Sequence, residues 1–71
     1  MEEITIHTEF IKLGQLLKLS GLCGSGTDAK FIIAEGLVKV NAEVETRRGK
    51  KIVHGDVVEF EGQKIKVLAD V

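Results

Sequence analysis

The spacing of apolar residues changes once along this chain, close to Gly36. Before that glycine, apolar positions recur at i, i+3, i+4 and i+7, which is the spacing of a helix with one buried face. They are Ala29, Ile32, Ile33 and Gly36 itself. After it, Val38 and Val40 alternate with Lys39, as in a half-buried strand. The chain is therefore expected to place helices before a sheet, with Gly36 ending the second helix.

The first half of the chain is expected to contain a short strand and two helices. Residues 4–6 alternate like a strand, and residues 10–19 carry apolar side chains at helical spacing. Thr8 is suited to cap the start of that first helix, and Gly21 to end it. The glycine-rich residues 21–26 then lead into the second helix. Two helices joined by so short a link form a helical hairpin.

The second half reads as short strands separated by turns. Turns are expected at residues 41–42, 54–56 and 61–62, with strands at 38–40, 43–45, 57–60 and 65–67. Residues 52–53 read only as a brief apolar pair. Helices packed on one side of an antiparallel sheet make an α+β fold. The prediction is a helical hairpin packed on a small, curved antiparallel sheet, in a single domain of residues 1–71.

Length and composition narrow the function further. A chain of 71 residues has room for one modest core. Its single cysteine, Cys23, indicates a reducing compartment, the cytosol, because small secreted domains pair their cysteines. No apolar run approaches the length of a membrane span, so no membrane partner is expected. Phe10, Phe31 and Phe60 are expected in the core rather than on a base-stacking surface, although Phe31 falls off the apolar stripe of its helix.

The net charge of −1 hides an uneven distribution. Residues 12–51 hold eight basic and four acidic side chains, and the acidic excess lies in the remainder of the chain. The field at a site is set by charges within a Debye length of about 8–10 Å. A local basic face for a polyanion is therefore compatible with a slightly acidic total.

The start of the second helix is one candidate anion site. Its unpaired backbone N–H groups and its dipole favour a phosphate, and Gly24 and Gly26 would let one approach closely. Ser25 and Thr27 offer hydroxyl groups, and Lys30 lies about one turn inside the helix. The alternative is an ordinary capped helix after a flexible turn.

Four cations around one glycine form the second candidate site. They are Arg47, Arg48, Lys50 and Lys51, around Gly49. Such charges repel one another, and a bound polyanion would hold them together. Arginine suits bidentate phosphate contacts, while lysine acts as a point charge. The alternative is a solvated loop without a partner.

Metal and catalytic chemistry find little support in the sequence. His7, His54 and Cys23 share no metal-ligand spacing, so neither a metal nor a cofactor is expected. Asp56 is expected to accept hydrogen bonds from nearby backbone in its turn. Asn41 could reach a nucleic acid, but its usual role would be to form the turn that follows Val40.

Four groups of residues form a joint pattern over residues 13–60. They are Leu16-Leu17, Ala29 with Ile32-Ile33, Glu35-Gly36-x-Val38-x-Val40-Asn41, and Gly55-Asp56-x-Val58. Together they resemble the RNA-binding domain named after the fourth small-subunit ribosomal protein, the S-four domain. The resemblance is closest to free-standing small bacterial members, similar to YaaA-like and YbcJ-like proteins. Two positions depart from the family pattern: Gly26 stands where many members have arginine, and Ala42 where many have glycine.

The resemblance implies an alpha-L RNA-binding motif whose hairpin lies beside the second helix, so that Lys39 and Lys30 extend one basic face. It also implies a non-enzymatic module that contacts structured RNA, either ribosomal RNA or a ribosome assembly intermediate. We expect a cytoplasmic monomer, with a ribosomal or assembly-factor protein as a further partner. A small protein-interaction domain is the alternative. The expected RNA-binding residues are Ser25, Gly26, Thr27, Lys30, Lys39, Asn41, Arg47, Arg48, Lys50 and Lys51.

Overall fold

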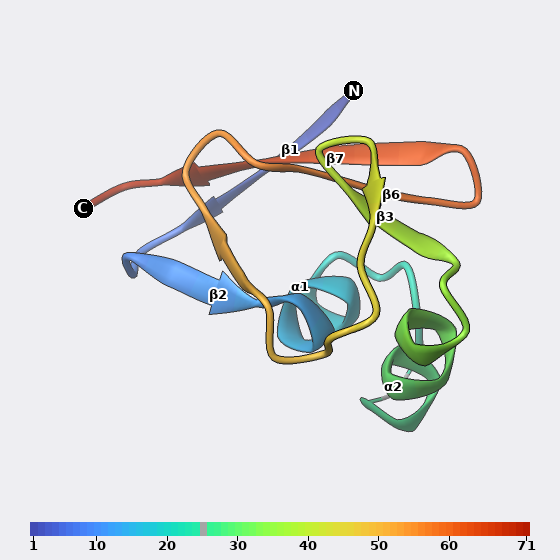
Figure 1. The fold of residues 1–71 in the computed structure, drawn as a ribbon. Coiled ribbons are helices and arrows are strands. Elements are labelled where there is room, and N and C mark those ends of the chain that lie inside the picture. Colours follow the sequence, from blue (N-terminus) through green and yellow to red (C-terminus); the bar gives the residue numbers. More distant parts are fainter. Residues whose placement is uncertain (25) are drawn as a thin grey trace.

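Two helices cover one face of a five-stranded sheet, and a two-stranded ribbon lies beside the first helix (Figure 1). The computed structural model describes residues 1–24 and 26–71, without the side chains of residues 26 and 27. In chain order the elements are β1 (Glu2–Ile6), β2 (Phe10–Lys12), α1 (Leu13–Leu19), α2 (Gly26–Ala34), β3 (Val38–Val40), β4 (Glu43–Val44), β5 (Lys51–Val53), β6 (Val57–Phe60) and β7 (Gln63–Ala69).

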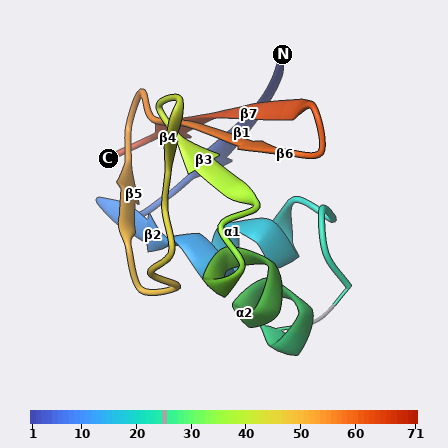
Figure 2. The ribbon, with the colours of Figure 1, turned by 45° about the vertical axis from the view of Figure 1, so that its right-hand side comes forward.

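The large sheet has the strand order β1-β7-β6-β3-β4. All neighbours run antiparallel except β1 and β7, which pair in parallel with Ile4 opposite Val67. The α+β class with a helical hairpin is therefore confirmed, but the sheet is mixed rather than purely antiparallel. A parallel pair requires a long connection, and here both helices and the intervening strands lie between β1 and β7 along the chain (Figure 2).

The first helix begins later than its apolar spacing predicts. Residues 10–12 form β2, which pairs antiparallel with β5, placing Phe10 opposite Val53. Local spacing fits a helix there, but pairing with a segment some forty residues away along the chain satisfies the backbone instead. For the same reason, residues 52–53 are part of a strand and not an isolated apolar pair.

The predicted cap of the first helix is also wrong. The Thr8 hydroxyl donates to the Phe10 carbonyl at 2.7 Å and so stabilises the turn before β2. Lys12 is the N-cap residue, and its backbone N–H donates to Gln15 Oε1 at 3.4 Å. The ends of the two helices agree with prediction, because Gly21 and Gly36 both adopt positive φ, of 79° and 77°.

The core lies between the helices and the large sheet. Its fully buried side chains of largest volume are Leu13, Leu16, Leu17, Ile33, Ile52, Ile65, Val38, Val58 and Val67. Phe60 is buried as predicted, with 8% of its surface exposed. The predictions for the other two phenylalanines were wrong, because Phe10 is 37% exposed and Phe31 is 63% exposed. Phe31 lies off the buried Ala29 and Ile33 stripe of α2, and Phe10 lies on the two-stranded ribbon.

Two hairpins use two-residue turns in which both residues have positive φ. Asn41 and Ala42 have φ of 52° and 70°, between the paired residues of β3 and β4. Glu61 and Gly62 have φ of 52° and 77° between β6 and β7. Turns of this kind match the twist of the strands and favour asparagine followed by glycine. Ala42 is therefore strained, since a Cβ is disfavoured in that backbone region.

We expect Ala42→Gly to raise the free energy of unfolding by about 0.5–1 kcal/mol, as relief of strain outweighs the added freedom of the unfolded chain. Urea denaturation followed by circular dichroism measures this change. Gly62→Ala is the matched reverse substitution, because a Cβ there meets no atom within 4 Å and only the positive φ opposes it. It should destabilise by a similar amount, and two changes of the same sign would contradict the explanation.

Candidate nucleic-acid interface

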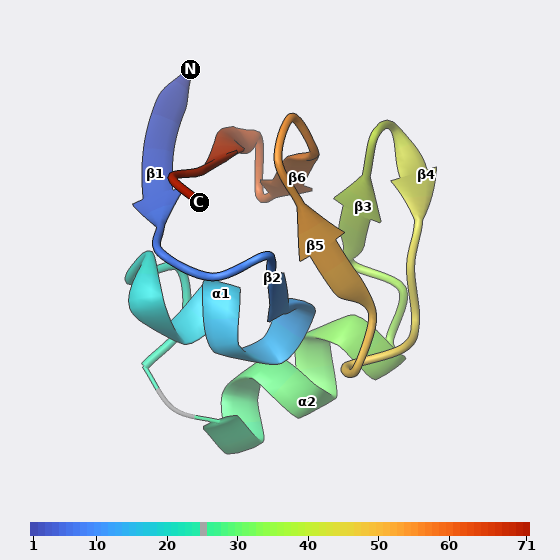
Figure 3. The ribbon, with the colours of Figure 1, turned by 90° about the vertical axis from the view of Figure 1, so that its left-hand side faces the viewer.

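The loop that carries the predicted cations is fixed to the start of α1. The Leu13 N–H donates to the Lys50 carbonyl at 2.9 Å, and the Gly14 N–H donates to the Arg48 carbonyl at 3.1 Å. The first N–H groups of a helix have no partner within the helix, so the loop satisfies two of them. Within the loop, the Lys50 N–H donates to the Arg47 carbonyl at 3.2 Å. Figure 3 shows this loop below β5, beside both helices.

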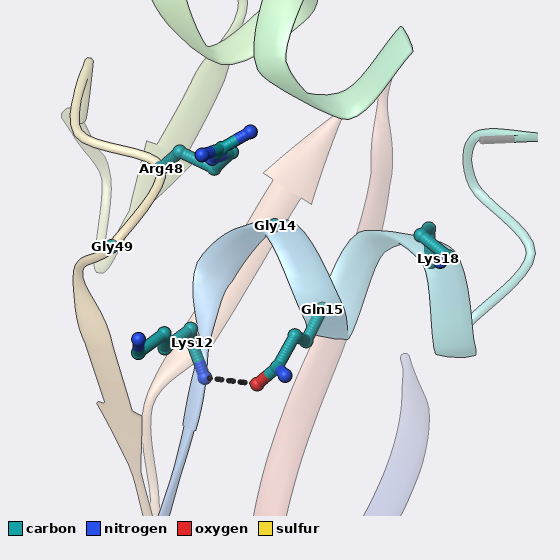
Figure 4. Close-up of a pocket in the computed structure, with 6 residues that line it drawn as sticks. All are labelled: Lys12, Gly14, Gln15, Lys18, Arg48 and Gly49. Atoms are coloured by element: carbon teal, nitrogen blue, oxygen red, sulfur yellow. Dashed lines mark hydrogen bonds between the residues drawn. The ribbon is translucent and has the colours of Figure 1, made fainter. Parts of the chain in front are cut away.

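Three cations border one hollow between this loop and α1. The hollow has a volume of about 360 Å³ and is lined by Lys12, Gly14, Gln15, Lys18, Arg48 and Gly49. We refer to it as the basic hollow. Arg48 reaches across Gly14, with Lys12 and Lys18 at opposite ends of α1 (Figure 4). None of the residues in its lining is acidic, so the cations favour an anionic ligand.

Gly14 makes room for the Arg48 side chain. A Cβ added at Gly14 would lie 2.6 Å from Arg48 Cγ and 3.2 Å from Cδ, which are closer than nonbonded carbon atoms approach. Gly14 itself is buried in the first turn of α1. The missing side chain therefore determines where the guanidinium group of Arg48 can lie.

We expect Gly14→Ala to displace Arg48 and to weaken RNA binding about as much as Arg48→Ala does. Arg48 is exposed and can move, so the change in stability should be small. The two single variants and the double variant form a thermodynamic cycle, measured by filter binding. If Gly14 acts through Arg48, the double variant will bind no worse than Arg48→Ala, whereas additive losses would indicate two independent effects.

The other predicted cations lie on the neighbouring side of Gly49. Arg47, Lys50 and Lys51 line a second hollow with that glycine, which also borders the basic hollow. The Lys51 ammonium lies over the ring of Phe10, 4.8 Å from its centroid. The structure thus brings together the predicted residues from 47 to 51.

Arg47 is held by a local ion pair. Its Nε and Nη2 atoms donate to the Glu45 carboxylate at 2.9 and 3.1 Å, and its backbone N–H donates to the same group at 3.0 Å. These hydrogen bonds lower the pKa of Glu45 to about 2. Since Glu45 stays ionised at any ordinary pH, it offsets the charge of Arg47 but leaves that of Arg48 in place.

Two of the predicted binding residues lie away from the basic hollow. Lys39 lies on the outer face of the sheet, which faces away from the core, and it is opposite Glu59 on β6. Asn41 is tied to the turn, because its amide donates to Asp56 Oδ1 at 3.0 Å and accepts the Val57 N–H at 3.0 Å. Asp56 also accepts the Val53 N–H at 2.9 Å, which is the role predicted for it.

The remaining predicted residues fall between Ser25 and Lys30 along the chain. Lys30 is exposed, and it does not line the basic hollow. Of the predicted phosphate site, Ser25 lies outside the described residues, and Gly26 and Thr27 are described without their side chains, as the first residues of α2. The resemblance placed the hairpin beside this helix, and Val44 of β4 does lie near its end, 3.5 Å from where a Cβ of Gly36 would stand.

Sequence reasoning missed the contribution of α1. Lys12, Gln15 and Lys18 recur at intervals of three, which places them on one side of a helix, away from the buried Leu16 and Leu17. That polar stripe was visible in the sequence. Its role in a binding surface could not be predicted, because only the folded chain brings Arg48 beside these residues.

Other chemistry gains no support from the described part of the chain. No group of three or more histidine, cysteine, aspartate or glutamate residues there could hold a metal ion. Burial raises the pKa of the Cys23 thiol, which packs against the core. None of the described helices has the length and apolar character that crossing a membrane requires.

Comparison with known proteins identifies the family of this chain. The S4 domain family matches residues 4–68. A Bacillus subtilis (strain 168) protein named "Probable ribosome maturation protein RlbA" is 52% identical over 59 residues, covering 83% of each chain. The Escherichia coli (strain K12) "Putative RNA-binding protein YbcJ" is 51% identical over 59 residues, covering 83% of this chain and 84% of that protein.

A solved structure supports the same assignment. The solution structure of YbcJ from E. coli, described as revealing an alfaL motif involved in RNA-binding, superimposes with a TM-score of 0.75 at 44% identity. The superposition covers 97% of this chain and 89% of that one. The resemblance expected from the sequence is therefore confirmed, together with the alpha-L arrangement of the helical hairpin. This chain belongs to the S4 domain family and is similar to its small bacterial members YbcJ and RlbA.

Proposed function

We propose that this S4-domain protein is a non-enzymatic module that binds structured RNA through its phosphates. The observation that carries the proposal is the convergence of cations on both sides of Gly49. They are Lys12, Lys18 and Arg48 on one side, and Arg47, Lys50 and Lys51 on the other. A-form RNA exposes phosphates and 2′-hydroxyl groups while its base edges lie in a deep groove, so a rigid basic surface suits it.

Among the described side chains, those on the opposite face show no such excess of positive charge. On the outer side of the sheet, Lys39 lies opposite Glu59 on the neighbouring strand, and Glu59 lies opposite Lys64. In the same way, Glu3 on β1 lies opposite Lys66 on β7. Charges that alternate in sign largely cancel at the distance of a bound polyanion. RNA is therefore expected to dock on the face that carries α1 and the loop.

The names of two relatives support a proposal for the class of RNA. RlbA carries the name "Probable ribosome maturation protein", and YbcJ carries the name "Putative RNA-binding protein". We infer that the RNA is ribosomal, bound during maturation of the ribosome in the cytoplasm. A ribosomal or assembly-factor protein would then be a second partner on the same particle.

The test is to measure affinity for a structured ribosomal RNA fragment as salt is raised. If three to five phosphates are contacted, log affinity should fall with log salt at a slope of about −3 to −4. A slope near zero would overturn phosphate recognition. Affinity capture with and without ribonuclease addresses the alternative: partners that disappear on treatment support RNA, whereas partners that survive support a protein-docking domain.

A further inference from the structure

A further hollow adjoins the basic hollow on the side of β2, and most of its lining is apolar. It has a volume of about 570 Å³ and is lined by Thr8, Phe10, Ile11, Gln15, Lys18 and Leu19. We refer to it as the apolar hollow. Gln15 and Lys18 line both hollows, so the two lie side by side along α1. A cationic site and an apolar site thus share a common border.

An exposed aromatic ring forms part of the apolar hollow. Phe10 is 37% exposed and Leu19 is 62% exposed. The pairing of β2 with β5 holds the backbone of Phe10, and the Lys51 ammonium lies 4.8 Å from its ring centroid. An aromatic ring beside a cation is the combination on which nucleobases stack in proteins that bind single-stranded nucleic acid.

We propose that the apolar hollow receives one unpaired nucleobase of the bound RNA, stacked near Phe10, while adjacent phosphates lie in the basic hollow. The inference rests on the proposed function and specifies the RNA as a helix interrupted by a bulged or looped nucleotide. Bases inside a continuous helix are stacked and paired, so only an extruded base can enter such a site. Lys18 lines both hollows, so its ammonium group could contact the phosphate of the same nucleotide whose base occupies the apolar hollow.

Charge and position favour a nucleobase over an apolar peptide as the occupant. Lys12, Lys18 and Arg48 stand along the border of the apolar hollow or next to it, and they attract a ligand that is itself anionic. A nucleotide joins a flat apolar base to a negative charge. An apolar peptide segment would leave these cations without a partner.

The test uses two RNA hairpins that differ only in one bulged 2-aminopurine in the stem. We expect the protein to bind the bulged RNA about 10-fold more tightly, and binding to quench the 2-aminopurine fluorescence by stacking. Phe10→Leu keeps an apolar side chain but removes the ring, so it should abolish the preference, while affinity for the uninterrupted stem should fall by less than about 3-fold through the lost contact with Lys51. Phe31→Leu, at the exposed phenylalanine of α2, is the matched control and should keep the preference.

The outcomes separate this inference from the proposed function. Equal affinity of the wild-type protein for the two hairpins, or equal effects of the two phenylalanine variants, would overturn the base site. Salt-dependent binding of the uninterrupted stem would persist in that case, and the proposed function would stand. If the wild-type protein bound neither hairpin in a salt-dependent way, the proposed function itself would be wrong. Circular dichroism of each variant establishes that it is folded, and the fluorescence of the wild-type complex does not depend on any variant.

Discussion

Replacing Arg47 and Arg48 together with alanine is expected to weaken RNA binding by about 10- to 100-fold, or about 1.4–2.8 kcal/mol, without unfolding the protein. Both side chains are exposed, and the loop is joined to α1 through backbone carbonyl groups that alanine retains. Filter binding measures the affinity, and the salt slope should fall by about one for each phosphate that the variant no longer binds. Most of the weakening should come from Arg48, because Glu45 already offsets the charge of Arg47.

The matched control is Lys39→Ala with Lys64→Ala. This pair also removes two positive charges, but both lie on the outer face of the sheet, in one cross-strand row with Glu59. If RNA docks beside α1, the affinity of the control should fall by less than about 3-fold, since only long-range attraction changes. Equal effects of the two double variants would mean that net charge, and not the surface beside α1, determines binding.

The second large effect is expected at Asn41, on stability and not on RNA binding. Asn41→Ala removes hydrogen bonds to Asp56 and from Val57, and it puts alanine at a φ of 52°. Two exposed hydrogen bonds and the cost of that backbone conformation together amount to about 2 kcal/mol. The melting temperature should fall by roughly 10 °C for a domain of this size, as measured by thermal circular dichroism.

Two further substitutions divide this effect into its causes. Asn41→Gly accepts the positive φ but cannot form the side-chain hydrogen bonds, so it should show about half of the destabilisation. Glu61→Ala changes the equivalent position of the other hairpin, where φ is also 52°, and should change stability by less than about 0.5 kcal/mol. If folded Asn41→Ala bound RNA much more weakly than the wild type, Asn41 would be a contact residue as well as a turn residue.

Features with a strong local cause were predictable from the sequence. Gly36 ends α2 because only a residue without a side chain adopts its φ of 77° easily. The turn at residues 41–42 follows from the two residues that separate paired strands. The burial of Ala29 and Ile33 follows from their helical spacing. Each of these features depends on residues that are only a few positions apart along the chain.

The sequence by itself therefore determined the α+β class, the helical hairpin, the turns and the presence of a basic run at residues 47–51. Only the tertiary structure decided that residues 10–12 form a strand, that Lys39 faces away from the helices, and that Arg48 joins Lys12 and Lys18 at one hollow. The physical reason is that hydrogen bonds between the loop and the start of α1 join segments more than thirty residues apart along the chain. The spacing of neighbouring residues carries no information about such an interaction, so the shape of the binding surface appears only when the chain has folded.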